Sequence, residues 1–162
     1  MVKSMLAGLE WFSAQYRKVL LPLLVILSSV LTIVVLYGVF MRYVMNDSPS
    51  WTEEAARYIM VWSALIAMSM ALRQNRHIGL TSLVERLWGK HTNTAFFFAD
   101  LAMLVFFMVM LVTGTTMAMF VMNQRSPSMN LPMWVPYLSI PVGGFFLSVE
   151  TLILILKKLV RS

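Results

Sequence analysis

The sequence contains no cysteine and little charge. Without cysteine, the chain can form no disulfide, zinc–thiolate site or iron–sulfur cluster, and it has no cysteine nucleophile. Charged residues make up 12% of the 162 residues, about half of what a soluble domain carries. Hydrophobic residues make up 59%, and the mean hydropathy is +0.76. The composition therefore predicts an all-α integral membrane protein whose helices pack against one another in lipid.

Catalytic and cofactor-binding motifs are also scarce. The only two histidines, His77 and His91, lie in a basic stretch, and there is no H-E-x-x-H motif. Neither a metal cluster nor a serine–histidine hydrolase can be assembled from this set. The only Gly-Lys pair, Gly89-Lys90, has Val84 where a phosphate-binding loop needs its first glycine. We expect no enzymatic activity, no cofactor and no metal site.

Four long apolar segments predict four transmembrane helices. Residues 19–41 are uncharged and would extend about 34 Å as a helix, enough to cross a hydrocarbon core of roughly 30 Å. Residues 58–72 are too short alone, so the second helix must begin near Ser48 or Ser50, where Ser50 and Glu53 fit a capping box. The predicted spans of this single membrane domain, residues 1–162, are residues 19–41, 49–72, 94–124 and 132–156.

Two further segments have the pattern of amphipathic helices at the membrane surface. In residues 1–18, apolar residues recur at three- and four-residue spacing opposite Lys3, Glu10 and Arg17. Residues 79–90 repeat the pattern between the second and third spans. The first span exceeds the apolar core of a typical signal peptide, so we expect it to be retained.

The basic residues indicate the orientation. All lysines and arginines except Arg42, Arg57 and Arg125 fall on the side that carries both termini, so we expect both termini to be cytoplasmic. Because these residues lie between apolar runs, they suit lipid headgroups rather than nucleic acid. The candidates for headgroup contact and orientation are Arg17, Lys18, Arg73, Arg76, Arg86, Lys90, Lys157 and Lys158.

The start of the second span is the densest polar cluster. Glu53, Glu54 and Arg57 can meet on one helix surface. One interpretation is helix-end chemistry, in which the acids favour the positive N-terminal end of the helix dipole and the arginine side chain reaches the membrane interface. The other interpretation is a polar contact with another membrane chain. Further along the same helix, small residues recur at four-residue spacing. Such residues suit close helix packing, and packing within this chain is the first explanation for them. The candidate interface residues are Trp51, Glu53, Glu54, Arg57, Tyr58, Trp62, Ser63, Ala67 and Ala71.

Two acidic residues, Asp100 and Glu150, fall in the third and fourth spans. Acids inside membranes suggest a proton relay, but they also occur as structural partners of cations. Both lie toward the predicted cytoplasmic ends, where pairing with Arg73 or Arg76 is possible. We favour structural pairing by about three to one over ion translocation.

The residues quoted above resemble one family. Trp51-Thr52-Glu53-Glu54-Ala55-Ala56-Arg57-Tyr58, then Val61-Trp62 and Arg73-Gln74-Asn75-Arg76-His77-Ile78, are similar to the small membrane subunit, DctQ type, of tripartite ATP-independent periplasmic (TRAP) transporters. Leu131-Pro132-Met133-Trp134-Val135-Pro136-Tyr137 is similar to the entry of that family's last helix. Two residues depart from the pattern: Ala67 replaces an expected small glycine, and Thr81 an aspartate.

The resemblance implies a non-catalytic scaffold in the bacterial inner membrane. Its partners would be a large elevator-type membrane subunit and a periplasmic substrate-binding protein. The complex would import organic acids, such as dicarboxylates or sialic acid, with sodium, and the large subunit would hold the substrate and ion sites.

A self-contained exporter or channel that works as a homo-oligomer is the alternative. Four-helix multidrug exporters are of comparable size but typically place a glutamate in their first span. Residues 19–41 contain no acid, so only Asp100 and Glu150 could replace it.

Overall fold

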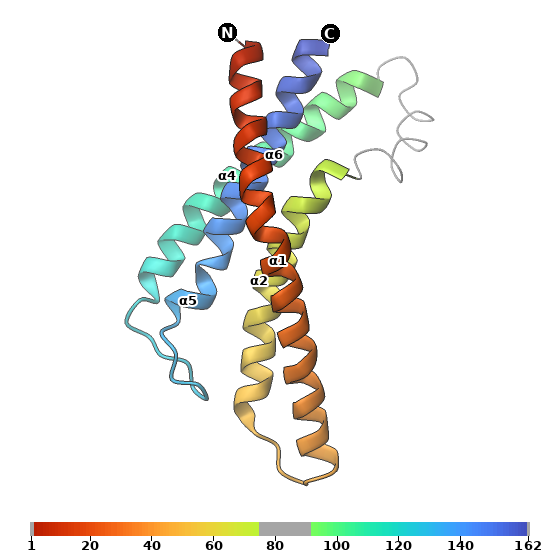
Figure 1. Cartoon of the computed structure of the whole chain (residues 1–162). Coiled ribbons are helices and arrows are strands. Elements are labelled where there is room, and N and C mark those ends of the chain that lie inside the picture. Colours follow the sequence, from red (N-terminus) through yellow and green to blue (C-terminus); the bar gives the residue numbers. More distant parts are fainter. Residues whose placement is uncertain (1, 75–91, 162) are drawn as a thin grey trace.

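The computed structural model describes residues 2–74 and 92–161, and of side chains those of residues 3–72 and 96–160. The described residues form helices and no strand (Figure 1). Four of these helical segments are long and apolar enough to cross a membrane, which confirms the predicted all-α membrane fold. The helices are α1 (Val2–Tyr43), α2 (Ser50–Gln74), α4 (Thr92–Phe120), α5 (Trp134–Tyr137) and α6 (Ser139–Arg161).

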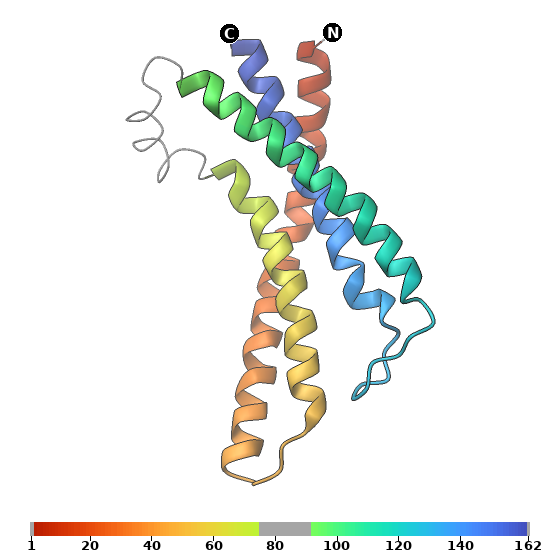
Figure 2. The same ribbon diagram turned by 180° about the vertical axis from the view of Figure 1, so that it is seen from behind.

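The helices form two pairs that cross each other. One pair is α1 with α2, and the other is α4 with α6, with the four-residue α5 beside them. In each pair the chain runs along one long helix and returns along the other in the opposite direction. Both termini therefore lie at the same end of the molecule (Figures 1 and 2). Toward the opposite end the two pairs diverge (Figure 2), and among the described residues α4 does not pack closely against α1 or α2. Because α6 contacts α1, α2 and α4, it is the central helix.

Glycines allow the helices to approach closely where they cross. A Cβ atom on Gly143 of α6 would lie 2.9 Å from Leu65 of α2. A Cβ atom on Gly144 would lie 3.0 Å from the backbone nitrogen of Leu111 in α4. On α1, Gly38 faces Thr52 of α2 with equally little space. These contacts bring backbones together as small residues do in membrane helix packing generally.

The first helix differs from the sequence-based expectation. Residues 1–18 were expected to form a separate surface helix, but α1 continues without a break from Val2 through Pro22 to Tyr43. The reason is local packing: Tyr16 lies beside Leu20 in a core cluster that joins α1, α2 and α6. Packing of this segment along α6 therefore accounts for its continuity with the rest of α1.

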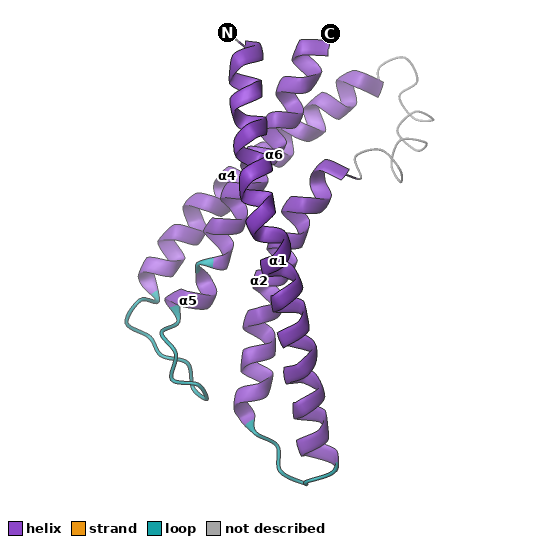
Figure 3. Cartoon of the chain, in the orientation of Figure 1, coloured by secondary structure: helices purple, strands orange, loops and turns teal. Residues whose placement is uncertain are grey.

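The entry to the fourth span is irregular, as its prolines predict. Residues 121–133 form a loop, α5 follows as one short turn, and Leu138 separates it from α6 (Figure 3). Pro136 and Pro141 lie on either side of this break. Neither proline can donate the backbone hydrogen bond that a continuous helix needs, so the helix is interrupted between them. The predicted surface helix at residues 79–90 lies outside the described residues.

Candidate functional site

The most deeply buried charged group of the described chain is the carboxyl group of Glu150, in the middle of α6. Its Oε1 atom accepts hydrogen bonds from the hydroxyls of Ser13, at 2.6 Å, and Tyr16, at 2.7 Å. Glu150 and Ser13 are fully buried. We call Ser13, Tyr16 and Glu150 the α1–α6 tie, because it joins the two helix pairs through groups that are more than 130 residues apart in the chain.

Two lysines at the end of α6 extend this connection. Lys157 forms an ion pair with Glu10 of α1 at 2.6 Å. Lys158 forms one with Asp100 of α4 at 2.7 Å, and its ammonium group lies 5.4 Å from the centre of the Phe96 ring. Adjacent residues of α6 therefore hold α1 and α4 on either side. Asp100 is buried and Lys158 half-buried, so their pair is better shielded from solvent than the Lys157–Glu10 pair.

At the opposite end of the molecule, Glu54 links α2 to the loop at residues 121–133. Its Oε2 atom accepts hydrogen bonds from the backbone N–H groups of Ser128, at 3.0 Å, and Met129, at 3.3 Å. Its Oε1 atom accepts one from the Tyr58 hydroxyl, which also lies 3.4 Å from the sulfur of Met133. We call Glu54, Tyr58, Ser128 and Met129 the α2–loop tie. It joins the two helix pairs where they diverge.

The neighbouring acid has a different partner. Glu53 pairs with Arg42 at the end of α1, and the Arg42 Nε atom donates to the Ser48 hydroxyl at 3.2 Å. This pair lies within the α1–α2 pair and is exposed. Adjacent acids thus have separate structural roles: Glu53 connects α2 to α1, and Glu54 connects α2 to the other helix pair.

Several predicted interface residues pack inside the chain. The Trp51 ring lies 5.8 Å from that of Tyr37 on α1, although Trp51 remains partly exposed. Trp62 packs against the core cluster that contains Ile66. Ser63 is buried, and its hydroxyl donates to the Ile59 carbonyl oxygen.

Other residues of α2 face outward along one side. Arg57, Ala64 and Ala71 are exposed, whereas Ala67 is half-buried. With their exposed neighbours they define a surface that we call the α2 outer face: Arg57, Met60, Val61, Ala64, Met68 and Ala71.

The predicted headgroup residues occupy diverse positions. Arg17 donates to the Met70 carbonyl oxygen at 3.0 Å and is half-buried, whereas Lys18 is exposed. Lys157 and Lys158 form the ion pairs described above. Four candidates lie outside the part of the chain whose side chains the structure describes: Arg73, Arg76, Arg86 and Lys90.

Sequence reasoning did not identify Ser13, Tyr16 or Arg42 as polar partners. Ser13 and Tyr16 are three residues apart and share one helix face, which is a weak signal for a common acceptor. Arg42 is the first cation after the first predicted span and lies 11 residues before Glu53, across the loop between the two helices, so charge complementarity was available as a signal. The loop N–H groups that bind Glu54 carry no sequence signal, because every residue but proline has one.

This fold, in which charged groups join the helices, is that of a multi-pass membrane protein of the helix-bundle type. The description "Tripartite ATP-independent periplasmic transporters, DctQ component" belongs to the family model that matches residues 31–161. The chain belongs to this family, the small permease subunits of bacterial TRAP transporters.

Curated relatives agree with this assignment. The chain is 27% identical over 132 residues to a putative TRAP transporter small permease protein of Haemophilus influenzae, with 82% of each chain covered. It is 28% identical to the sialic acid TRAP transporter small permease protein SiaQ of Vibrio cholerae, over 78% of this chain and 70% of that one. It is 25% identical to the isethionate TRAP transporter permease protein DctMQ of Oleidesulfovibrio alaskensis, over 89% of this chain but 24% of that one.

Proposed function

We propose that this chain is the stationary scaffold of a sodium-driven TRAP transporter and holds a large membrane subunit in place while that subunit moves substrate. The observation that carries the proposal is that two carboxylates join the helix pairs at separate levels: Glu150 in the middle of α6, and Glu54 where the pairs diverge. A scaffold must resist force without changing shape, and two separated connections resist a change in crossing angle better than one.

The chemistry of these connections supports a structural role. The oxygens of Glu54 and the Oε1 atom of Glu150 accept hydrogen bonds within the chain. Asp100 pairs with Lys158. A transported proton or cation needs a carboxylate that can exchange partners with water, whereas these groups hold helices together. This arrangement supports the scaffold over the self-contained exporter, which would need Asp100 or Glu150 along a conduction path.

The α2 outer face is the surface that we propose for the large subunit. It combines Arg57 with two alanines and two methionines, and small or flexible side chains permit close and adaptable helix packing. The exposed face of α1 is different, because it consists largely of bulky β-branched and leucine side chains, such as Ile26, Ile33 and Leu36, which suit lipid. We therefore propose the α2 outer face, rather than the whole set of interface residues predicted from the sequence, as the contact surface for the large subunit.

We propose the other components of the transporter and its location on the same basis. The long DctMQ permease contains a region similar to this chain in 24% of its length, which fits a small subunit fused to a large one. A periplasmic substrate-binding protein would deliver an organic acid of the dicarboxylate or sialic acid type, and membrane lipids would surround the spans. The chain would lie in the bacterial inner membrane with both termini in the cytoplasm, as the distribution of lysine and arginine favours.

Copurification tests the central part of this proposal. The chain is tagged, co-expressed with the large permease encoded beside it and purified in several mild detergents. We expect the two chains to elute together at a mass equal to the sum of one or more of each. Elution of the tagged chain alone, as a homo-oligomer that transports a cation in liposomes, would contradict the scaffold.

Arg57→Ala tests the proposed surface. If Arg57 contacts the large subunit, the substitution lowers the amount of copurified partner more than it lowers insertion of this chain into membranes. Arg125→Ala is the matched control, because Arg125 is also an exposed arginine at the same end of the molecule but lies in the loop at residues 121–133. Equal losses of insertion and assembly in Arg57→Ala would instead indicate that Arg57 serves only the start of α2.

A further inference from the structure

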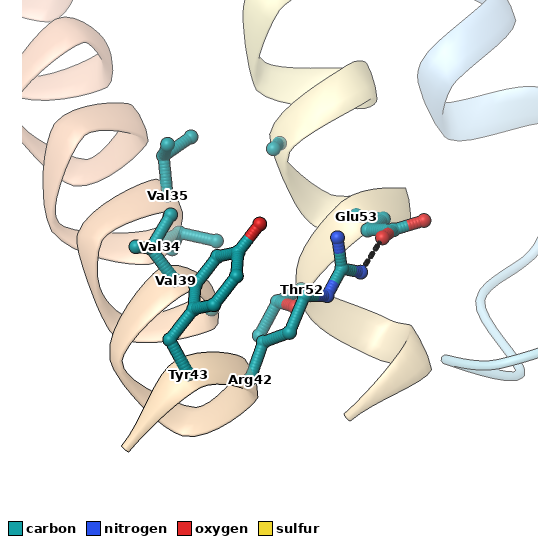
Figure 4. A pocket seen from close by; sticks show the side chains of 9 residues that line it. Val34, Val35, Val39, Arg42, Tyr43, Thr52 and Glu53 are labelled. Atoms are coloured by element: carbon teal, nitrogen blue, oxygen red, sulfur yellow. Dashed lines mark hydrogen bonds and ion pairs between the residues drawn. The ribbon is translucent and has the colours of Figure 1, made fainter. Parts of the chain in front are cut away.

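A pocket of about 240 Å³ lies between the end of α1 and the start of α2 (Figure 4). Its inner wall is apolar and is formed by Val34, Val35 and Val39 of α1. Its outer end is polar, where Arg42 and Glu53 form their ion pair. Neither the scaffold function nor the ties between the helix pairs make use of this pocket.

The pocket has the same order of chemical groups as a phospholipid. Arg42 follows directly after the uncharged residues 19–41, which places its guanidinium group at the level of the lipid headgroups. Val34 lies eight residues earlier, and therefore about 12 Å deeper along the helix axis. Gly38 lies between them and packs closely against Thr52 of α2, so the two helices meet in this part of the wall. An acyl chain can lie against the valines while its headgroup reaches the ion pair.

The charges at the outer end remain accessible to a ligand. Arg42 and Glu53 keep 48% and 60% of their side-chain surfaces exposed. The Nη2 atom of Arg42 donates a hydrogen bond to Glu53, and its Nε atom donates one to Ser48. Because a guanidinium group has five N–H donors, Arg42 retains donors for a phosphate. Glu53 uses Oε1 and retains Oε2 as an acceptor for an ammonium group. In Figure 4 the Tyr43 side chain, which also lines the pocket, points into the space between the two helices.

From this arrangement we propose that the pocket binds a phospholipid whose headgroup carries a primary ammonium, as phosphatidylethanolamine does. The phosphate lies on Arg42, the ammonium donates hydrogen bonds to Glu53, and one acyl chain covers the valine wall. The adjacent positive and negative groups of the pocket are complementary to this zwitterion. Phosphatidylcholine keeps the positive charge but offers no N–H donor to Glu53, and phosphatidylglycerol offers hydroxyl donors but no positive charge. Neither can therefore form the charge-assisted hydrogen bond that a primary ammonium forms with Glu53.

Lipid titration of the purified full-length chain, followed by native mass spectrometry, tests the proposal. The chain is delipidated in mild detergent and titrated with phosphatidylethanolamine, phosphatidylcholine and phosphatidylglycerol of identical acyl chains. We expect phosphatidylethanolamine to bind about tenfold more tightly than the other two, as one additional charge-assisted hydrogen bond provides. Equal affinities for the three lipids would overturn the proposal.

Variants separate the contributions of the two charges. Arg42→Gln should reduce the affinity for phosphatidylethanolamine and phosphatidylcholine alike, because both lose the phosphate contact. Glu53→Gln should remove the preference between them while binding persists. Arg125→Gln, an exposed arginine outside the pocket, is the matched control and should bind as the unaltered chain does. Unchanged lipid binding by Arg42→Gln would overturn the proposal.

A third variant leaves the ion pair intact. Val35→Phe places a larger side chain in the pocket without altering Arg42 or Glu53, and it should weaken lipid binding even if the charge variants fold poorly. The titration uses this chain alone, so its outcome is independent of whether a large subunit copurifies.

Discussion

The hydroxyl of Tyr16 in α1 donates a hydrogen bond of 2.7 Å to the Oε1 atom of Glu150 in α6. This contact connects the first and last spans of the chain at a site where Glu150 is fully buried. The same oxygen accepts the Ser13 hydroxyl, whereas Oε2 has no hydrogen-bond partner among the described residues. A carboxyl group in such a position depends strongly on the donors that it has.

Removal of one donor should therefore destabilise the fold measurably. Tyr16→Phe keeps the ring, which packs 4.6 Å from that of Phe146, but removes the hydroxyl. We expect the free energy of unfolding to fall by about 0.5–2 kcal/mol, measured by titration with denaturing detergent. Tyr43→Phe is the control, because Tyr43 is 75% exposed. Equal stability of the two variants would contradict the structural role of the α1–α6 tie.

Two adjacent acids allow a sharp test of the α2–loop tie. Glu54→Ala removes the acceptor for Ser128 and Met129, whereas Glu53→Ala removes only the partner of Arg42. Because the chain lacks cysteine, spin labels can be attached to cysteines introduced at Asp47 and Asn123 in the two loops. These positions are exposed.

The distance distribution between the labels is then measured by double electron–electron resonance. Glu54→Ala should broaden it, because the loop at residues 121–133 is released from α2, and should cost about 1 kcal/mol of stability. Glu53→Ala should leave the distribution narrow. Broadening in both variants, or in neither, would show that Glu54 does not fix the divergent end of the molecule.

The sequence predicts the helices well because long apolar runs determine them directly. Three spans follow from charge-free stretches and their length, the second also needs the helix start near Ser48 or Ser50, and the irregular entry to the last span follows from Pro136 and Pro141. The sequence also indicates that Asp100 and Glu150 need partners. It does not identify those partners, because Lys158 and Tyr16 are brought to them by the angle at which the helices cross. That angle depends on close contacts at Gly143 and Gly144, which carry no charge or periodic pattern.

The continuous first helix illustrates the same limit. Amphipathic spacing in residues 1–18 predicts an apolar face but not what covers it. A membrane surface and the side of α6 both satisfy the pattern, and the structure places Ser13 and Tyr16 against α6. Likewise, the small residues Ser63, Ala67 and Ala71 predict close packing along one side of the helix. In the structure Ser63 is buried, Ala67 is half-buried and Ala71 is exposed. Helical periodicity defines a face but not its neighbour.

The crossing of α4 and α6 gives a further prediction. Gly144→Ala adds a Cβ atom 3.0 Å from the backbone nitrogen of Leu111 and 3.1 Å from the carbonyl oxygen of Phe107. Backbone atoms cannot move aside as a side chain can, so we expect a loss of about 1–3 kcal/mol in unfolding free energy. Gly8→Ala is the control, because a Cβ atom there meets nothing within 4 Å; it should gain about 0.5–1 kcal/mol from helix propensity. A neutral Gly144→Ala would mean that the two helices are farther apart in the membrane.

The α2 outer face can be tested with a bulky side chain. Ala64→Trp should block close approach of the large subunit and reduce the copurified partner about tenfold, equivalent to about 1.4 kcal/mol of binding energy. Ala102→Trp is the matched control, because Ala102 is also an exposed alanine within a span but lies on α4. Both variants should insert into membranes and remain folded, since neither replaces a buried residue. If Ala102→Trp disrupts assembly and Ala64→Trp does not, the large subunit binds the α4 side, and the interface assigned to α2 is wrong.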